Sequence, residues 1–224
     1  MQSDPRLIAA LDFPTAEAAK QAVEEIGDAV SYYKVGMELY YAAGNDMIRF
    51  LKERGKHVFL DLKLQDIPNT VASALKVETQ LGVDMINVHA VGGKKMMEEA
   101  AKAVREKAAE LGMERPKLIA VTILTSMDEE QFADLNYKNT IAEQVVALAK
   151  LAKAAGLDGV VASPKEAAEM VMIYSNAAFD ELAELSSNER MQKMQAFICH
   201  TERIMGAEEG ILQEPIMRIF QKQA

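Results

Sequence analysis

A short segment at residues 59–70, FLDLKLQDIPNT, sets charged residues in an otherwise apolar stretch. Side chains of an extended strand alternate between two faces, which puts Asp61 and Lys63 on the same face. An exposed edge strand could carry them as a solvated salt bridge, whereas a buried strand would need them paired, because an unpaired buried charge is very costly. Asp61 and Asp66 would favour the charged form of Lys63, and a fixed ammonium can stabilise a developing negative charge.

The elements around this segment read as strands that alternate with helices. The expected strands are 6–11, 30–36, 58–63, 85–90, 118–124 and 157–162. Such alternation predicts a parallel sheet with helices outside it, and a strand spacing of roughly 25 to 30 residues suits a (β/α)8 barrel of the TIM type. A doubly wound open sheet is the alternative, but the glycine-rich dinucleotide fingerprint that would favour it is not found.

Polar side chains gather where these strands end. At the carboxyl ends of the strands, or just beyond them, are Asp12, Lys34, Asp61, Lys63, His89, Thr125 and Ser163. Enzymes built on a (β/α)8 barrel place their chemistry at this end of the barrel. Each residue alone is more often structural than catalytic, so it is their shared position that predicts an active site.

The repeat stops near residue 168. We expect residues 1–168 to form a partial barrel that carries the catalytic motifs and is truncated after its sixth βα unit. Residues 169–224 read as an atypical, Met-rich helical segment that replaces the last βα units. These helices could plug the open side of the barrel, because methionine fills irregular space well, or they could be a poorly packed substitute. The sequence leaves both interpretations open.

Charge and composition exclude several classes of partner. The net charge of −9 argues against binding to nucleic acid or to an anionic membrane, and no apolar run is long enough to span a membrane. A single cysteine, Cys199, and an N-terminus without the pattern of a signal peptide predict a cytoplasmic protein. The three histidines, His57, His89 and His200, lack the spacing of a metal site.

Six motifs in this order resemble those of the orotidine 5'-phosphate decarboxylase family over roughly residues 6–168. They are LIAALDF, YYKVGMELYYAAG, VFLDLKLQDIPNTV, INVHAVGG, AVTILTSM and GLDGVVASPKEA. The resemblance implies decarboxylation of orotidine 5'-phosphate to UMP, a step of pyrimidine biosynthesis, without a cofactor. A fixed cation suits that reaction, because the carbanion left at C6 lies in the ring plane and the ring π-system cannot spread its charge.

The resemblance also implies which residues carry the reaction. The catalytic charge network would consist of Lys34, Asp61, Lys63 and Asp66. Within it, Lys63 would stabilise the carbanion and deliver the proton that replaces the carboxylate. Asp66 and Thr70 would be supplied by the partner subunit of a homodimer.

Substrate-binding residues are implied in the same way. Asp12 and Lys34 resemble the residues that contact the ribose hydroxyls. Ile67 resembles the apolar wall near the substrate carboxylate, Thr70 a ribose contact made across the dimer interface, and Thr125 the residue that bonds the pyrimidine edge. His89 also matches a family position, but a histidine at a strand end is more often structural.

The resemblance does not extend to the phosphate site. Family members hold the substrate phosphate with a P-G-I-R-like and a V-G-R-like element after the seventh and eighth strands, and this chain has neither. Arg203 and Arg218 lie on helical segments without the glycine-rich turn that brings backbone N–H groups to a phosphate. The phosphate-binding residues therefore stay unassigned.

Two alternatives to the decarboxylase remain. One is a catalytically impaired or non-enzymatic partial barrel that dimerises but cannot hold phosphate. The other is a sugar-phosphate decarboxylase or lyase of the same barrel suprafamily, which also carries D-x-K-x-x-D but typically uses a magnesium ion. The IPNT and LTS elements argue for the nucleotide substrate.

Overall fold

The computed structural model describes residues 7–163 together with residues 170 and 173. Almost all of the Met-rich segment expected at 169–224, including Arg203 and Arg218, lies outside these residues. The described chain divides into two compact units, one of residues 7–61 and 81–84 and the other of residues 62–80 and 85–163 with 170 and 173. Each unit is built from βα repeats.

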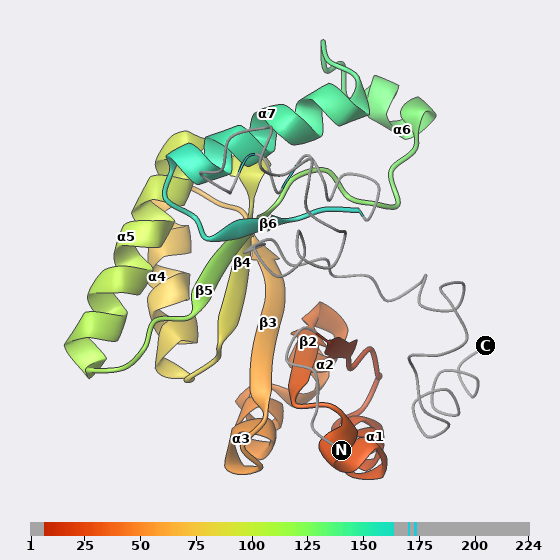
Figure 1. The fold of residues 1–224 in the computed structure, drawn as a ribbon, viewed down its shortest axis with the longest axis vertical. Helices are drawn as coiled ribbons and strands as arrows, with labels where there is room; N and C mark the ends of the chain where they lie inside the picture. The colour runs from red at the N-terminus through yellow and green to blue at the C-terminus, as the bar shows by residue number, and fades with distance from the viewer. Residues whose placement is uncertain (1–6, 164–169, 171–172, 174–224) are drawn as a thin grey trace, which may run out of the picture. The chain divides into compact units, whose positions relative to one another are not determined.

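The first unit holds three parallel strands and the helices that connect them (Figure 1). In chain order its elements are β1 (Ile8–Ala10), α1 (Ala16–Ile26), the 3₁₀ turn η1 (Gly27–Ala29), β2 (Tyr32–Gly36), α2 (Met37–Ala43), α3 (Asn45–Glu53) and the first part of β3 (His57–Leu64). The pairing sets Ala10 beside Lys34 and Gly36 beside Asp61. The ends of the three strands therefore bring their polar residues to one edge of the sheet.

Local sequence explains the helix boundaries in this unit. Thr15 caps α1, where its hydroxyl accepts a hydrogen bond from the amide of Ala18 at 3.3 Å. The helix ends at Gly27, whose φ of +57° is a conformation that glycine adopts without strain. The face of α1 that carries Ala19, Val23 and Ile26 is buried, as the apolar spacing predicts.

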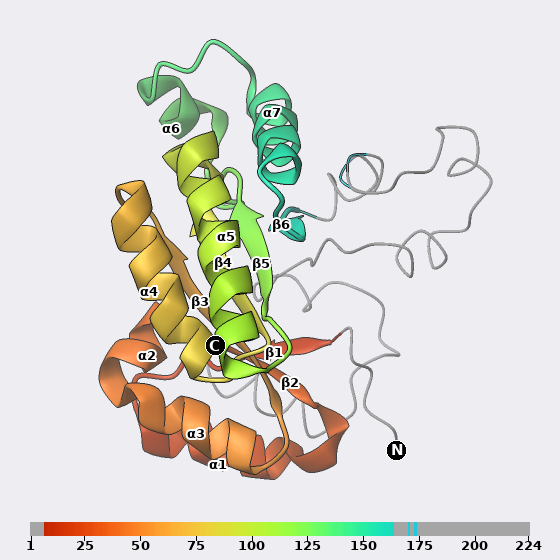
Figure 2. The same cartoon turned by 90° about the vertical axis from the view of Figure 1, so that its left-hand side faces the viewer.

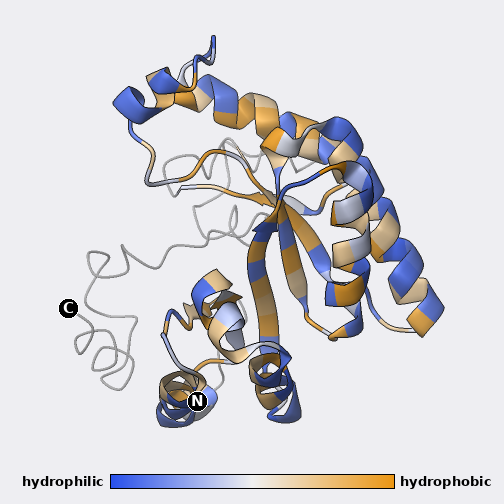
Figure 3. Cartoon of the chain, turned by 180° about the vertical axis from the view of Figure 1, so that it is seen from behind, coloured by the Kyte–Doolittle hydropathy of each residue, from blue (hydrophilic) through white to orange (hydrophobic). Residues whose placement is uncertain are grey.

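The second unit continues the same alternation from the end of β3. Its elements are α4 (Pro68–Gln80), β4 (Met85–His89), the 3₁₀ turn η2 (Ala90–Gly92), α5 (Lys94–Leu111), β5 (Lys117–Val121), α6 (Glu129–Asp134), α7 (Ile141–Ala154) and β6 (Gly159–Val161). β5 pairs in parallel with both β4 and β6. Figure 2 shows α4 and α5 packed side by side. Figure 3 shows that the strands are mainly hydrophobic, whereas the helices alternate between apolar and polar residues, which is the pattern of strands covered by amphipathic helices.

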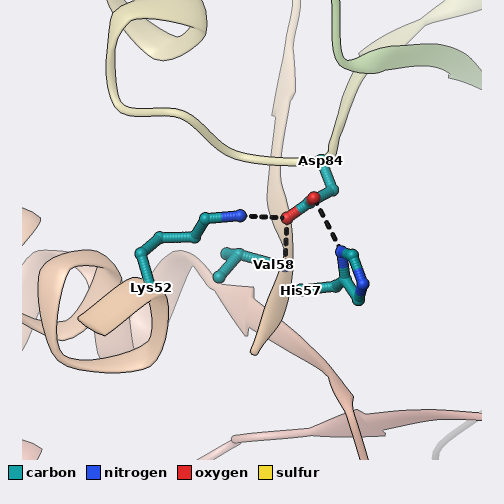
Figure 4. Close-up of polar contacts among 4 residues, drawn as sticks. All are labelled: Lys52, His57, Val58 and Asp84. Carbon is teal, nitrogen blue, oxygen red and sulfur yellow. Dashed lines mark hydrogen bonds and ion pairs between the residues drawn. The ribbon is translucent and has the colours of Figure 1, made fainter. Parts of the chain in front are cut away.

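Two aspartates that precede a strand each form hydrogen bonds to one residue at the start of the neighbouring strand. Asp84, next to β4, accepts hydrogen bonds from the Val58 amide, from Lys52 and from His57, each at 2.8 Å (Figure 4). The Asp84 amide in turn donates to the Val58 carbonyl at 2.9 Å. Because the side chain and the backbone of Asp84 both bond Val58, the start of β3 has a defined position relative to Asp84.

Asp158 repeats this arrangement in the second unit. Its carboxylate accepts two hydrogen bonds from Arg115 at 2.6 Å and one from the Leu118 amide at 2.8 Å, and its own amide donates to the Leu118 carbonyl. Burial alone would raise the pKa of Asp158, but the bonds from Arg115 and Leu118 outweigh it and hold the pKa below its usual value. The same balance lowers the pKa of Asp84.

The expected strands correspond to the observed ones, with shifts of one to three residues at most ends. The expected strand 118–124 ends already at Val121, because the chain leaves the sheet through an exposed loop at Leu124 and Thr125. The short helix α6, capped by Asp128, follows that loop and was not foreseen. Within the described ranges, the structure contains no helix with the length and apolar character that crossing a membrane requires.

Candidate active site

Lys34 joins two carboxylates at the ends of the first three strands. Its Nζ lies 2.9 Å from Oδ1 of Asp12, which follows β1, and 3.6 Å from Oδ2 of Asp61 in β3. The side chains of Lys34 and Asp61 are only 8% and 7% exposed, whereas that of Asp12 is 48% exposed. Asp61 is therefore buried and paired with Lys34, which excludes the solvated edge strand as an explanation of its charge.

Gly36 leaves the space that this cluster occupies. A Cβ atom at Gly36 would lie 3.2 Å from Nζ of Lys34 and 3.5 Å from Oδ1 of Asp12. The φ of Gly36 is −87°, which any residue can adopt, so its backbone does not require glycine. The close approach of the lysine and aspartate side chains is what makes a larger residue unfavourable here.

Lys63 follows Asp61 by two residues in the same strand, but its backbone is not extended. Its φ of +52° lies in the left-handed region, which lysine seldom adopts. The Lys63 amide donates a hydrogen bond of 2.8 Å to Oδ1 of Asn87 in β4. The alternation of faces expected for Asp61 and Lys63 presumes an extended strand, and that condition is not met at Lys63.

The segment after β3 carries three further predicted site residues on the surface of the single chain. Asp66, Ile67 and Thr70 are all exposed, and Ile67 is 67% exposed. Oδ1 of Asp66 accepts a hydrogen bond from the Ile67 amide at 2.6 Å, and the Ile67 carbonyl accepts one from the Thr70 amide at 3.0 Å. Pro68 is the first residue of α4, a position where its missing N–H costs nothing. This turn therefore has a defined conformation although its side chains are open to solvent.

The predicted site residues thus fall into separate groups. Lys34 contacts both Asp12 and Asp61 in the first unit, and the turn of Asp66, Ile67 and Thr70 belongs to the second unit. Thr125 is exposed in the loop after β5. Within the described residues, no group of three or more His, Cys, Asp or Glu side chains could hold a metal ion.

Sequence reasoning missed Asn87, although the signal was present. Asn87 is the polar residue in the middle of β4, whose sequence is MINVH, and it is 1% exposed. A buried amide needs hydrogen-bond partners, by the same argument that drew attention to Asp61. The partner could not be named from the sequence, because it is a backbone group of a residue with unusual geometry.

Comparison with known proteins identifies the family. The model of the "Orotidine 5'-phosphate decarboxylase / HUMPS family" matches residues 5–196, a longer range than the motifs near residues 6–168 indicate. The orotidine 5'-phosphate decarboxylase of Moorella thermoacetica is 49% identical over 167 residues. That alignment covers 74% of this chain and 66% of the relative, so the matched region spans about two thirds of the relative's length.

Solved structures of the same family support the fold. The orotidine 5'-phosphate decarboxylase of Lactobacillus acidophilus gives a TM-score of 0.72 at 40% identity and covers 77% of this chain and 78% of its own. The orotidine 5'-monophosphate decarboxylase of Methanocaldococcus jannaschii gives a TM-score of 0.59 at 29% identity, covering 83% and 80%. These similarities confirm the prediction of an α/β fold of the (β/α)8 type over the doubly wound alternative. The chain belongs to the orotidine 5'-phosphate decarboxylase / HUMPS family.

Proposed function

We propose that the chain decarboxylates orotidine 5'-phosphate to UMP, with Lys63 as the catalytic residue. The observation that carries this proposal is the buried ion pair between Lys34 and Asp61. Asp61 precedes Lys63 by two residues in β3. A barrel strand that ends in a buried charge network is suited to electrostatic catalysis, because the charges are held in place before the substrate binds. The names of the relatives support the choice of substrate.

The proposed reaction needs one bond broken and one formed. The bond between C6 of the pyrimidine and the carboxylate breaks, carbon dioxide leaves, and the electron pair stays on C6. The ammonium of Lys63 stabilises that pair and gives it a proton, which forms the C6–H bond of UMP and leaves a neutral amine. Asp61 and Asp66 are assigned to the same charge network as Lys63, and Lys34 compensates the buried Asp61. The reaction requires no cofactor.

The remaining residues are assigned to substrate binding. Asp12, exposed beside Lys34, is suited to the ribose hydroxyls, because a carboxylate and an ammonium held 2.9 Å apart offer an acceptor and a donor together. Thr125, in the exposed loop after β5, is assigned to the pyrimidine edge. Ile67 is assigned to the apolar wall near the substrate carboxylate.

We further propose that two copies of the chain form a cytoplasmic homodimer in which the partner supplies Asp66 and Thr70. Both residues are exposed in the single chain, and Ile67 beside them is a large apolar side chain that is 67% exposed. Covering Ile67 would be favourable, by about 25 cal/mol for each Å² of apolar surface removed from water. Sedimentation of the purified protein tests this proposal, which a monomer with full activity would contradict.

A spectrophotometric assay of orotidine 5'-phosphate consumption tests the function directly. We expect turnover by the wild-type chain, loss of turnover in Lys63→Ala, and normal turnover in Lys102→Ala, which removes an exposed lysine of α5. Turnover should persist in the presence of EDTA, whereas a requirement for magnesium would favour the sugar-phosphate enzymes instead. Absence of any substrate loss at high enzyme concentration would sink the proposal and favour the non-enzymatic partial barrel.

A further inference from the structure

The unusual backbone of Lys63 requires an explanation. In the described part of the chain, the non-glycine residues with positive φ are Lys63, at +52°, and Asn136, at +55°. Asparagine tolerates the left-handed region because its short side chain can bond nearby backbone, and Asn136 lies in a loop after α6. Lysine has no such compensation, and Lys63 lies within a strand. The conformation therefore persists only if surrounding contacts enforce it.

Asn87 provides a contact that can do this. Its Oδ1 lies 2.8 Å from the Lys63 amide nitrogen. The orientation of the Asn87 amide follows from chemistry, because a backbone N–H can only donate and the atom that faces it must be an acceptor. Asn87 is 1% exposed in β4, so neither the side chain nor its hydrogen bond competes with bulk water.

The direction of the Lys63 side chain depends on this backbone. Rotation of φ from the left-handed to the extended region would swing the Cα–Cβ bond and redirect the ammonium at the end of the side chain. Misplacement of a reacting group by about 1 Å can cost roughly 100-fold in rate. A hydrogen bond that selects one backbone conformation is therefore also a bond that positions the ammonium.

We propose that Asn87 is a positioning residue that holds the backbone of Lys63 in its left-handed conformation and thereby aims the ammonium at C6 of the substrate, an inference that rests on the function proposed above. Asn87 itself does not contact the reacting atoms in this proposal. Its carboxamide oxygen acts through the Lys63 amide.

A matched pair of variants tests the proposal. Asn87→Leu keeps the approximate shape of the side chain but removes the acceptor, and Asn87→Asp keeps both the shape and an acceptor oxygen. We expect kcat of Asn87→Leu to fall by about 10- to 100-fold with KM changed by less than about threefold. Asn87→Asp should recover at least about tenfold of that loss. Equal kcat values for the two variants would overturn the proposal.

Thr79 supplies the control for loss of a buried hydrogen bond as such. Its hydroxyl donates to the Leu75 carbonyl at 2.7 Å within α4, and it is 0% exposed. Thr79→Val should lower the unfolding midpoint and leave kcat unchanged. If Thr79→Val lowered kcat as much as Asn87→Leu, the effect at Asn87 would be general destabilisation, and the proposed role would be wrong.

Amide hydrogen exchange at position 63 measures the contact without reference to activity. The Lys63 amide should be protected in the wild-type chain and should exchange at least about tenfold faster in Asn87→Leu. A wild-type amide that exchanges as fast as an exposed one would overturn the proposal even if Asn87→Leu did not fold. A protected amide in a protein without turnover would instead show that the contact exists but that the proposed function is wrong. The proposed positioning role of Asn87 would then be wrong as well.

Discussion

The ammonium of Lys34 lies 3.6 Å from the carboxylate of Asp61, and both side chains are buried. Asp12, which Lys34 also contacts, is half exposed. Both charges of this pair are largely shielded from solvent, so loss of one partner is costly for the other.

Replacement of Lys34 should destabilise the protein for this reason. We expect Lys34→Met to lower the free energy of unfolding by about 3–5 kcal/mol, because it removes the ammonium that lies 3.6 Å from the buried carboxylate of Asp61. The double variant Lys34→Met/Asp61→Asn should regain part of this loss. Urea unfolding measures all three proteins, and a single variant within about 1 kcal/mol of wild type would contradict the expectation.

Gly36→Ala should impair the site and leave the fold intact. The new methyl group would lie 3.2 Å from Nζ of Lys34, so the lysine ammonium must shift by a few tenths of an ångström. We expect kcat/KM to fall by about tenfold, since small displacements of groups that bind substrate are costly and Lys34 and Asp12 are proposed to bind it. The unfolding midpoint should change little, because the φ of Gly36 suits alanine. Unchanged kinetics would argue against a role of the Asp12–Lys34 pair in binding.

Acid should destabilise the protein through Asp84 and Asp158. Burial raises the pKa of each, but hydrogen bonds outweigh it and the net pKa lies below the usual value. The carboxylates of Asp84 and Asp158 therefore bind protons less readily in the folded state than in the unfolded chain. The resulting stability is present above the pKa of the unfolded chain and is lost as the pH falls through the folded pKa.

Urea midpoints between neutral pH and pH about 3 measure this acid dependence. The midpoint should fall as the solution is acidified, and Asp84→Asn should show a shallower fall than wild type, because it removes one of the carboxylates whose pKa is lowered in the folded state. An Asp84→Asn profile parallel to that of wild type would show that this carboxylate does not contribute.

Glu78 should produce the opposite dependence on pH. Its side chain is buried in α4, its Oε2 has no hydrogen-bond partner among the described residues, and burial raises its pKa to about 8. Between the pKa of the unfolded chain and about 8, the folded state holds a proton that the unfolded chain releases. Stability should therefore decrease as the pH rises through this window, by about 1.4 kcal/mol for each pH unit.

The variant Glu78→Gln removes this ionisation and keeps the shape of the side chain. Its stability should be nearly constant between pH about 5 and 8, where wild type loses stability. At the alkaline end of the window, the variant should therefore be more stable than wild type. Thermal unfolding across this range decides the matter, and parallel curves for the two proteins would show that Glu78 does not titrate there.

Much of the fold could be predicted because the signals are local. Apolar runs that alternate with helical spacing indicated the βα units, and the expected strand 58–63 differs from β3 by one residue at each end. Charges at the end of that strand indicated a site, since burial of Asp61 without a partner would be too costly. The pairing of Asp61 with Lys34 is the kind of compensation that this argument requires.

The remainder depended on contacts between distant segments. The left-handed backbone of Lys63 could not be foreseen, because periodicity presumes an extended strand and the stabilising acceptor, Asn87, lies 24 residues further along the chain. The bonds of Asp84 and Asp158 were missed for a similar reason, although both follow the same Gly-x-Asp pattern, GVD and GLD. The hydrogen-bond partners of such an aspartate can be predicted only when the neighbouring strand is known.

The register at the start of β3 affects the position of Asp61 near its other end. Side chains change faces with every residue, so a slip of one position would turn Asp61 away from Lys34. The pairing of β2 with β3 opposes such a slip, because it sets Gly36 beside Asp61 and the His57 amide donates to the Ser31 carbonyl at 2.7 Å. Substitutions at the start of β3 should therefore disturb the Lys34–Asp61 pair at the other end of the strand, although they lie outside the proposed site.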